Sequence, residues 1–117
     1  MTDRIKSVVS LTARSENHLV AARAASAGRS AHTIHCGLGS VLRQILLALA
    51  VGRSLGEHES PGEATLHVLV GRVRLSVGAE HWEAVVGNHL PIPPSRHDLT
   101  AIEDSVVLLS LVAGSRG

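Results

Sequence analysis

The sequence predicts an all-β domain, an antiparallel sandwich or barrel, with one α-helix at its N-terminus. From residue 30 onward, short runs rich in Val, Ile and Leu alternate with Gly, Pro and Asp, which is typical of successive short strands joined by turns. Such regular strands favour antiparallel sheets over a parallel sheet with crossover helices. The chain is 44% hydrophobic but contains neither Phe nor Tyr, and Trp82 is its single tryptophan. Its core must therefore be built from Leu, Val, Ile and Ala, which pack well in many short strands.

The N-terminal helix is expected over residues 12–27. This segment is rich in alanine, begins at Thr12 as a possible cap, and stops at Gly28, where a left-handed residue would end it. Leu19, Val20 and Ala22 are expected near its buried stripe. Such a helix is weak alone and should pack against the barrel or a second subunit.

Eight strands are expected after the helix. They cover residues 31–36, 41–51, 64–70, 72–77, 81–86, 89–92, 98–102 and 106–112. A chain of 117 residues is long enough for one hydrophobic core. We therefore expect one domain, with an N-terminal segment 1–29 that holds the helix and a barrel over 30–117.

Two stretches carry a resemblance to a known family. Residues 87–97, GNHLPIPPSRH, combine a turn, a short apolar strand, a proline corner and one imidazole. Residues 55–75, LGEHESPGEATLHVLVGRVRL, precede them. Together they resemble the two motifs of the cupin superfamily, over roughly residues 41–112. The resemblance implies a cupin-type double-stranded β-helix, which is a jelly-roll barrel.

The first cupin motif has two histidines one residue apart, a turn, a glutamate on the next strand, and a glycine seven residues after that glutamate. Here Pro61 and Gly62 match the turn, Gly71 matches the closing glycine, and Ala64 stands at the glutamate position. The resemblance places His58 and Ser60 at the histidine positions. A loop counted one residue longer would place Glu57 and Glu59 there instead, and we choose His58.

The second motif runs from a glycine through a proline to the last histidine. The residues that match it in order are Gly87, Pro93, Ser95 and His97, with Asn88 in place of a common aspartate. Of the four usual metal ligands, only His58 and His97 remain. Two imidazoles leave most of a coordination sphere to water, so little or no bound metal is expected.

Other histidines could complete a metal site for Fe, Mn, Ni or Zn. The candidates are His32, His35 and His89, because they lie near strand starts or turns. His67 has the opposite parity from Ala64 and should face outward. Trp82 could line a pocket or pair with another subunit.

Strand parity and the resemblance together define an expected barrel pocket. Its residues are His58, Ser60, Ala64, Leu66, Val68, Leu90, Ile92 and His97, and parity adds Val70 and Leu108. We predict that this pocket binds an unidentified small molecule. The alternative is a metal-dependent enzyme of the cupin dioxygenase or isomerase type that uses His58 and His97 as ligands. A third possibility is an assembly or regulatory partner in which the pocket is a relic.

Charge and composition bound the partners and the compartment. The net charge is +1 and the arginines are scattered, so no nucleic-acid surface is expected. The longest apolar run, residues 45–51, is too short to span a bilayer, and the first residues lack a signal-type apolar stretch. Cys36 cannot form an internal disulfide and is expected to be buried. We expect a cytoplasmic protein that forms a homodimer through sheet edges.

Overall fold

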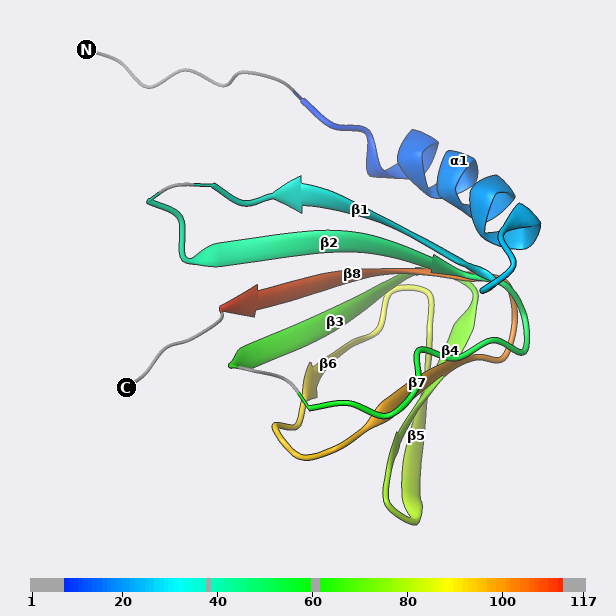
Figure 1. Ribbon diagram of the computed structural model, residues 1–117, viewed down its shortest axis with the longest axis vertical. Coiled ribbons are helices and arrows are strands. Elements are labelled where there is room, and N and C mark those ends of the chain that lie inside the picture. The colour runs from blue at the N-terminus through cyan, green and yellow to red at the C-terminus, as the bar shows by residue number, and fades with distance from the viewer. Residues whose placement is uncertain (1–7, 38, 60–61, 113–117) are drawn as a thin grey trace.

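The computed structural model describes residues 8–37, 39–59 and 62–112, which form one helix and eight strands. In chain order the elements are α1 (Leu11–Ala24), β1 (Arg29–His35), β2 (Leu42–Leu49), β3 (Glu63–Val70), β4 (Arg72–Val77), β5 (Glu80–Val85), β6 (His89–Ile92), β7 (Asp98–Ala101) and β8 (Ser105–Val112). The strands form a five-stranded sheet in the order β1-β2-β8-β3-β6 and a three-stranded sheet in the order β5-β4-β7 (Figure 1). All named strand pairs are antiparallel, so the predicted fold class is confirmed.

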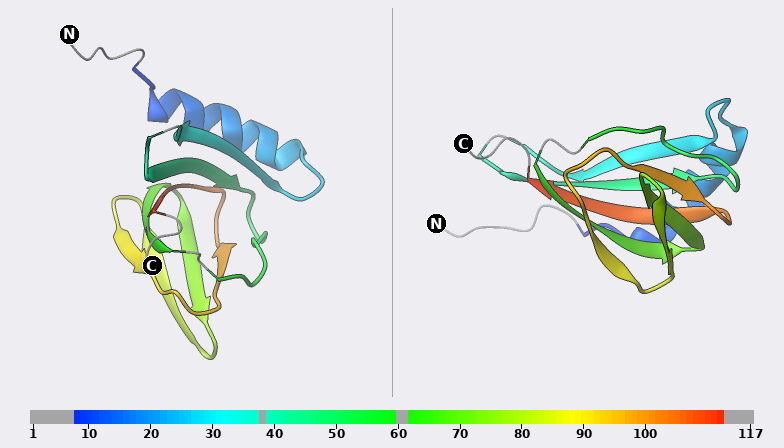
Figure 2. Two further views of the ribbon diagram at one scale, coloured as in Figure 1. Left: turned by 60° about the vertical axis from the view of Figure 1, so that its left-hand side comes forward. Right: turned by 90° about the horizontal axis from the view of Figure 1, so that it is seen from below.

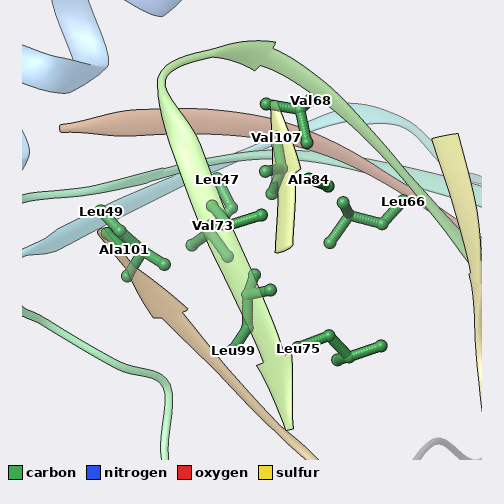
Figure 3. Close-up of a cluster of buried hydrophobic side chains, with 10 residues drawn as sticks. All are labelled: Leu47, Leu49, Leu66, Val68, Val73, Leu75, Ala84, Leu99, Ala101 and Val107. Atoms are coloured by element: carbon green, nitrogen blue, oxygen red, sulfur yellow. The ribbon is translucent and has the colours of Figure 1, made fainter. Parts of the chain in front are cut away.

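The two sheets enclose one core of aliphatic side chains (Figure 3). On β3, Ala64, Leu66 and Val68 are buried, whereas the intervening His67 is exposed, which is the alternation expected of a half-buried strand. The buried cluster comprises Leu47, Leu49, Leu66, Val68, Val73, Leu75, Ala84, Leu99, Ala101 and Val107. The expected core of Leu, Val and Ala is therefore present, although Ile contributes only at its margin.

The segment between β2 and β3 runs beside β7 and extends the three-stranded sheet. Leu55 N–H donates to Leu99 O over 3.0 Å, and Ala101 N–H donates to Arg53 O over 2.9 Å. Isolated bridges pair Ser54 with Thr100 and residue 58 with residue 97. This backbone pairing carries the chain across the end of the barrel and positions the candidate site.

Helix α1 starts earlier and ends earlier than the sequence predicted. The cap is Ser10, whose hydroxyl accepts a hydrogen bond from Ala13 N–H over 3.1 Å, and Thr12 lies inside the helix. The helix ends before Ala25, which has an extended backbone with ψ 142°. Gly28 has a φ of 71° and joins the helix to β1, so the left-handed glycine lies in the turn beyond the helix end.

One side of α1 covers the outer face of the five-stranded sheet over β1 and β2 (Figure 2). Leu19 and Ala22 are buried there against Leu46 and Val106. Val20 was expected in the buried stripe, but that prediction is wrong, because its side chain is 63% exposed. Residues 19 and 22 share a helix face, whereas residue 20 lies about 100° away from residue 19.

The carboxylate of Asp104 connects three separate segments at one end of this layer. Its Oδ1 accepts from Val51 N–H over 2.8 Å, and its Oδ2 accepts from Arg23 Nε over 2.7 Å. The hydrogen bond from Val51 lowers the pKa of Asp104, and the hydrogen bond from Arg23 lowers it further. The last turn of α1 is thus attached to the turn after β2 and to the β7–β8 turn.

We expect Asp104→Asn to lower the free energy of unfolding by about 1 kcal/mol near neutral pH, since asparagine keeps an acceptor but loses the charge beside Arg23. The folded pKa of Asp104 lies below its ordinary value of 3.8, so its ionic contribution is complete above 3.8 and is lost as pH falls through the folded value. Urea unfolding curves should therefore show the two proteins converging in strong acid. An equal difference at neutral and strongly acidic pH would contradict this account.

Candidate functional site

His58 and His97 face each other across a short antiparallel bridge at one end of the barrel. His58 N–H donates to His97 O, and His97 N–H donates to His58 O, both over 2.9 Å. Pro93 and Pro94 follow the edge strand β6, which already contains Pro91, and the chain then turns back toward β7. Backbone pairing therefore fixes both histidines on the same face of the sheet.

The two imidazole rings lie edge to face, with centroids 4.5 Å apart and an interplanar angle of 61°. The Nδ1 of His58 lies 2.8 Å from Gly56 O, and the Nδ1 of His97 lies 2.8 Å from Ser95 O. A carbonyl oxygen can only accept, so each Nδ1 carries the hydrogen and donates it. In the neutral form of each ring, Nε2 is then an acceptor. His97 is 3% exposed, whereas His58 is exposed.

A cavity of about 200 Å³ opens beside these rings. Its walls are mainly leucines, and its polar side chains are His58, Glu59 and His97. Among the described residues, the lining is Leu55, His58, Glu59, Gly62, Ala64, Leu66, Leu75, Ile92, His97, Leu99, Leu109 and Leu111. We call this space the histidine cavity. At its rim, Arg96 Nε donates to Glu57 Oε1 over 3.1 Å, so Glu57 pairs with an arginine whereas Glu59 borders the cavity.

The predicted pocket residues fall into several places. His58, Ala64, Leu66, Ile92 and His97 all line the histidine cavity. Val68 is fully buried deeper in the core, and Leu90 lines a second cavity described below. Ser60 lies outside the described residues.

Two further residues were expected to face the pocket, and both predictions are wrong. The register of β3 against β8 shifts between Val68 and Val70, so Val70 packs against the α1 cluster instead. Leu108 pairs with Leu46, which lies beneath α1, and therefore faces outward. Leu109 takes the inward position and lines the cavity.

Sequence reasoning missed five leucines of this cavity, namely Leu55, Leu75, Leu99, Leu109 and Leu111. Alternate residues of a strand face the same side, so an inward-facing Val73 on β4 predicts an inward-facing Leu75. Leu109 and Leu111 had no such signal, since β8 reads SVVLLSLV with apolar residues on both faces. β8 is a central strand, and its Val106 and Val107 are buried on opposite faces.

The described residues of the site bring two imidazoles together, fewer than the three or more protein ligands of a typical transition-metal site. Ala64 stands where a cupin glutamate would supply a ligand, and within residues 8–37, 39–59 and 62–112 no group of three His, Cys, Asp or Glu is placed to hold an ion. His32 and His35 lie on β1, at the far edge of the five-stranded sheet. His89 lines the second cavity. None of these three joins His58 and His97.

The second cavity is larger, about 630 Å³, and lies between β5 and β6, away from the histidine pair. It is lined by Leu75, Trp82, Glu83, Ala84, Gly87, Asn88, His89, Leu90, Pro91 and Pro93. We call it the tryptophan cavity. The Glu83 carboxylate already has hydrogen-bond partners, since Arg74 and Arg72 donate to it over 2.9 and 3.1 Å. These hydrogen bonds, from Arg74 first and then Arg72, lower the pKa of Glu83.

Two other predictions concern single side chains. His67 is exposed on β3, as expected. Cys36 was expected to be buried, but it follows the edge strand β1 and is exposed, so that prediction is wrong. In the part of the chain that the structure describes, no helix has the length and hydropathy needed to cross a membrane.

Several solved structures have a similar fold. A conserved protein of unknown function from Streptococcus pyogenes aligns with a TM-score of 0.73 at 21% identity, over 97% of this chain and 93% of that chain. KdgF from Halomonas sp. aligns with a TM-score of 0.66 at 15% identity, over 79% of this chain and 85% of that chain. A cupin superfamily protein from Desulfitobacterium hafniense DCB-2 aligns with a TM-score of 0.63 at 16% identity, over 73% of this chain and 79% of that chain.

No protein-family model matches the sequence, and no curated protein matches it either. At the identities above, the structural likeness speaks for the fold and leaves the activity open. The strand order, the antiparallel pairing and the similarity to cupin structures agree with the motif resemblance. The chain therefore has the cupin fold, a small jelly-roll barrel with one N-terminal helix.

Proposed function

We propose that this protein binds one small organic ligand in the histidine cavity and that binding requires no metal ion. The observation that carries the proposal is the pair of imidazoles at the edge of an otherwise apolar cavity. A few convergent polar groups in an apolar cavity are typical of a ligand site. The cavity walls would take the carbon skeleton, and the histidines would orient the polar group.

The polar groups indicate which chemistry the ligand carries. Each Nδ1 faces a backbone carbonyl and donates to it, so Nε2 is the ring nitrogen left for a ligand, and in the neutral form of the ring it accepts. The Glu59 carboxylate, also in the lining, adds further acceptors. A ligand that brings a hydrogen-bond donor fits these acceptors, and we propose an alcohol with an apolar body.

The proposal is tested by titrating ¹⁵N-labelled protein with 1-butanol and following amide shifts around His58 and His97. We expect saturable shifts that His97→Ala weakens about tenfold, the value of one hydrogen bond to a buried acceptor. Because His97 is buried, His58→Ala is the second variant, since an exposed side chain can be removed without loss of the fold.

The matched control is His67→Ala, which removes an exposed imidazole from the outer face of β3. It should bind 1-butanol like the wild type. Equal affinity in the wild type, His58→Ala and a folded His97→Ala protein would overturn the proposed function.

A second candidate is a metal-dependent cupin enzyme with His58 and His97 as ligands. One observation favours it: both Nδ1 atoms are anchored to backbone carbonyls, which is how metal-binding histidines are commonly oriented. Elemental analysis of untagged protein separates the two candidates. A stoichiometric Fe, Mn, Ni or Zn ion that is lost in the His58→Ala, His97→Ala double variant would establish the second candidate and displace the first.

The proposal also includes a cytoplasmic homodimer. Val41 and Leu42 are 76% and 38% exposed, and a second copy would cover such apolar side chains. An exposed free thiol at Cys36 suits a reducing compartment.

A further inference from the structure

We infer that the tryptophan cavity binds the apolar end of the same ligand, so that the ligand is an elongated alcohol with its hydroxyl group at His58 and His97. This inference rests on the proposed function and extends it from a head-group site to a two-part site. It assigns a binding role to Trp82, which lies outside both motifs.

The two cavities are neighbours that share one wall. Leu75 lines both of them, and its side chain is 3% exposed. Across the β3–β6 pair, Leu66 lines the histidine cavity and its direct partner Leu90 lines the tryptophan cavity. In Figure 3, Leu66 and Leu75 project into the space between the two sheets. A change of rotamer at Leu75 is therefore the local movement that would join the cavities.

Trp82 is oriented toward this shared space by strand register. It pairs directly with Leu75 on β4, and Ala84 pairs with Val73, so these side chains share the inner face of the three-stranded sheet. Trp82 is nevertheless 49% exposed. It is the only large aromatic side chain in the chain, and a half-exposed indole over a cavity offers a flat apolar surface for a ligand.

The remaining lining of the tryptophan cavity is suited to an apolar group. Glu83 is paired with two arginines, and Asn88 Oδ1 accepts from Val85 N–H over 2.9 Å. His89 is a further polar side chain of the lining, whereas Leu90, Pro91 and Pro93 have no polar side-chain atoms. The Glu83 carboxylate, which already accepts from two arginines, is therefore poorly placed to bind a cationic group of a ligand.

The volumes support a two-part ligand. The histidine cavity, at about 200 Å³, is below the range of about 300–1,000 Å³ that is usual for organic ligands. The tryptophan cavity, at about 630 Å³, lies within that range but lacks the paired imidazoles. A ligand that occupies both cavities uses the polar groups of the first and the apolar walls of the second.

The test is a titration of the full chain with 1-alkanols from 1-butanol to 1-octanol, followed by NMR. The chain has one tryptophan, so its single indole N–H signal reports on the tryptophan cavity alone. We expect 1-butanol to shift only signals near His97, and longer alcohols to shift the indole signal as well. Affinity should rise about fourfold for each added methylene that is buried.

The key variants are Trp82→Ala and its control Val86→Ala, which removes a side chain that is 59% exposed just after β5 and absent from the cavity lining. Trp82→Ala should keep the wild-type affinity for 1-butanol and lose the gain for 1-octanol, whereas Val86→Ala should keep both. Because Trp82→Ala has no indole signal, alcohol binding to this variant is followed through the amide signals near His97.

The outcomes separate the two proposals. If affinity depends on His97 but stops rising after the shortest alcohols in the wild type, the extension is overturned and the proposed function stands. If Trp82→Ala binds 1-octanol as tightly as the wild type, the extension is likewise overturned. If no alcohol binds in a manner that depends on His58 or His97, the proposed function is overturned, and the extension with it.

Discussion

Replacing Gly71 by alanine is expected to destabilise the fold by about 3–5 kcal/mol, enough to unfold much of the protein. Gly71 joins β3 to β4 with a φ of 83°, a conformation that L-residues rarely adopt. A Cβ atom there would also collide with the Asp104 carbonyl oxygen and the Ser105 hydroxyl. The Asp104 carbonyl is backbone, so the clash cannot be relieved by a side-chain rotation.

The matched control is Gly78→Ala in the β4–β5 turn. Gly78 also has a positive φ, 60°, but no atom lies within 4 Å of a Cβ built there. This substitution should cost only the backbone strain, about 1 kcal/mol. Urea unfolding of both variants measures the difference, and equal losses would show that packing against Asp104 contributes nothing.

Leu46→Ala is expected to lower the free energy of unfolding by about 3–4 kcal/mol. Leu46 is fully buried on the outer face of β2, where it packs in the cluster with Leu19, Ala22 and Val106. The deletion leaves a hole beneath α1 that the sheet cannot close. Hydrogen exchange of the α1 amides should accelerate more than exchange of the amides in β4.

Leu42→Ala provides the control on the same strand and the same face. Leu42 lies four residues before Leu46 and is 38% exposed. Its truncation should cost about 1 kcal/mol, since part of the side chain is already in water. An equal loss in the free energy of unfolding for both variants would show that packing against α1 does not stabilise Leu46.

Much of the strand layout follows from local sequence signals. The runs 72–77 and 89–92 were predicted with the bounds of β4 and β6, because glycine or proline stands next to each. The helix ends were predicted less well. Both Ser10 and Thr12 are residue types that can cap a helix, and the structure uses Ser10. At the other end, the local sequence does not show that the backbone becomes extended at residue 25, where the chain leaves the helix toward β1.

The site could be predicted in part. The resemblance pointed to His58 and His97, and the structure brings their rings together, while the role of both in binding stays a prediction. The sequence named Trp82 as a possible pocket residue, but the tryptophan cavity as a whole could not be predicted, because its walls come from β4, β5, β6 and the loops beside them. Only the closure of the barrel places these walls around one space.

The sequence by itself determined the class of fold, the order of short strands and the glycine turns, because these depend on side-chain period and on φ angles within a few residues. Tertiary structure decided which face of β8 points inward. Helix α1 covers Val106 on the outer face of β8 and the barrel core covers Val107 on the inner face, so both faces are apolar and alternation along the strand carries no signal. Leu109 rather than Leu108 lines the cavity for that reason.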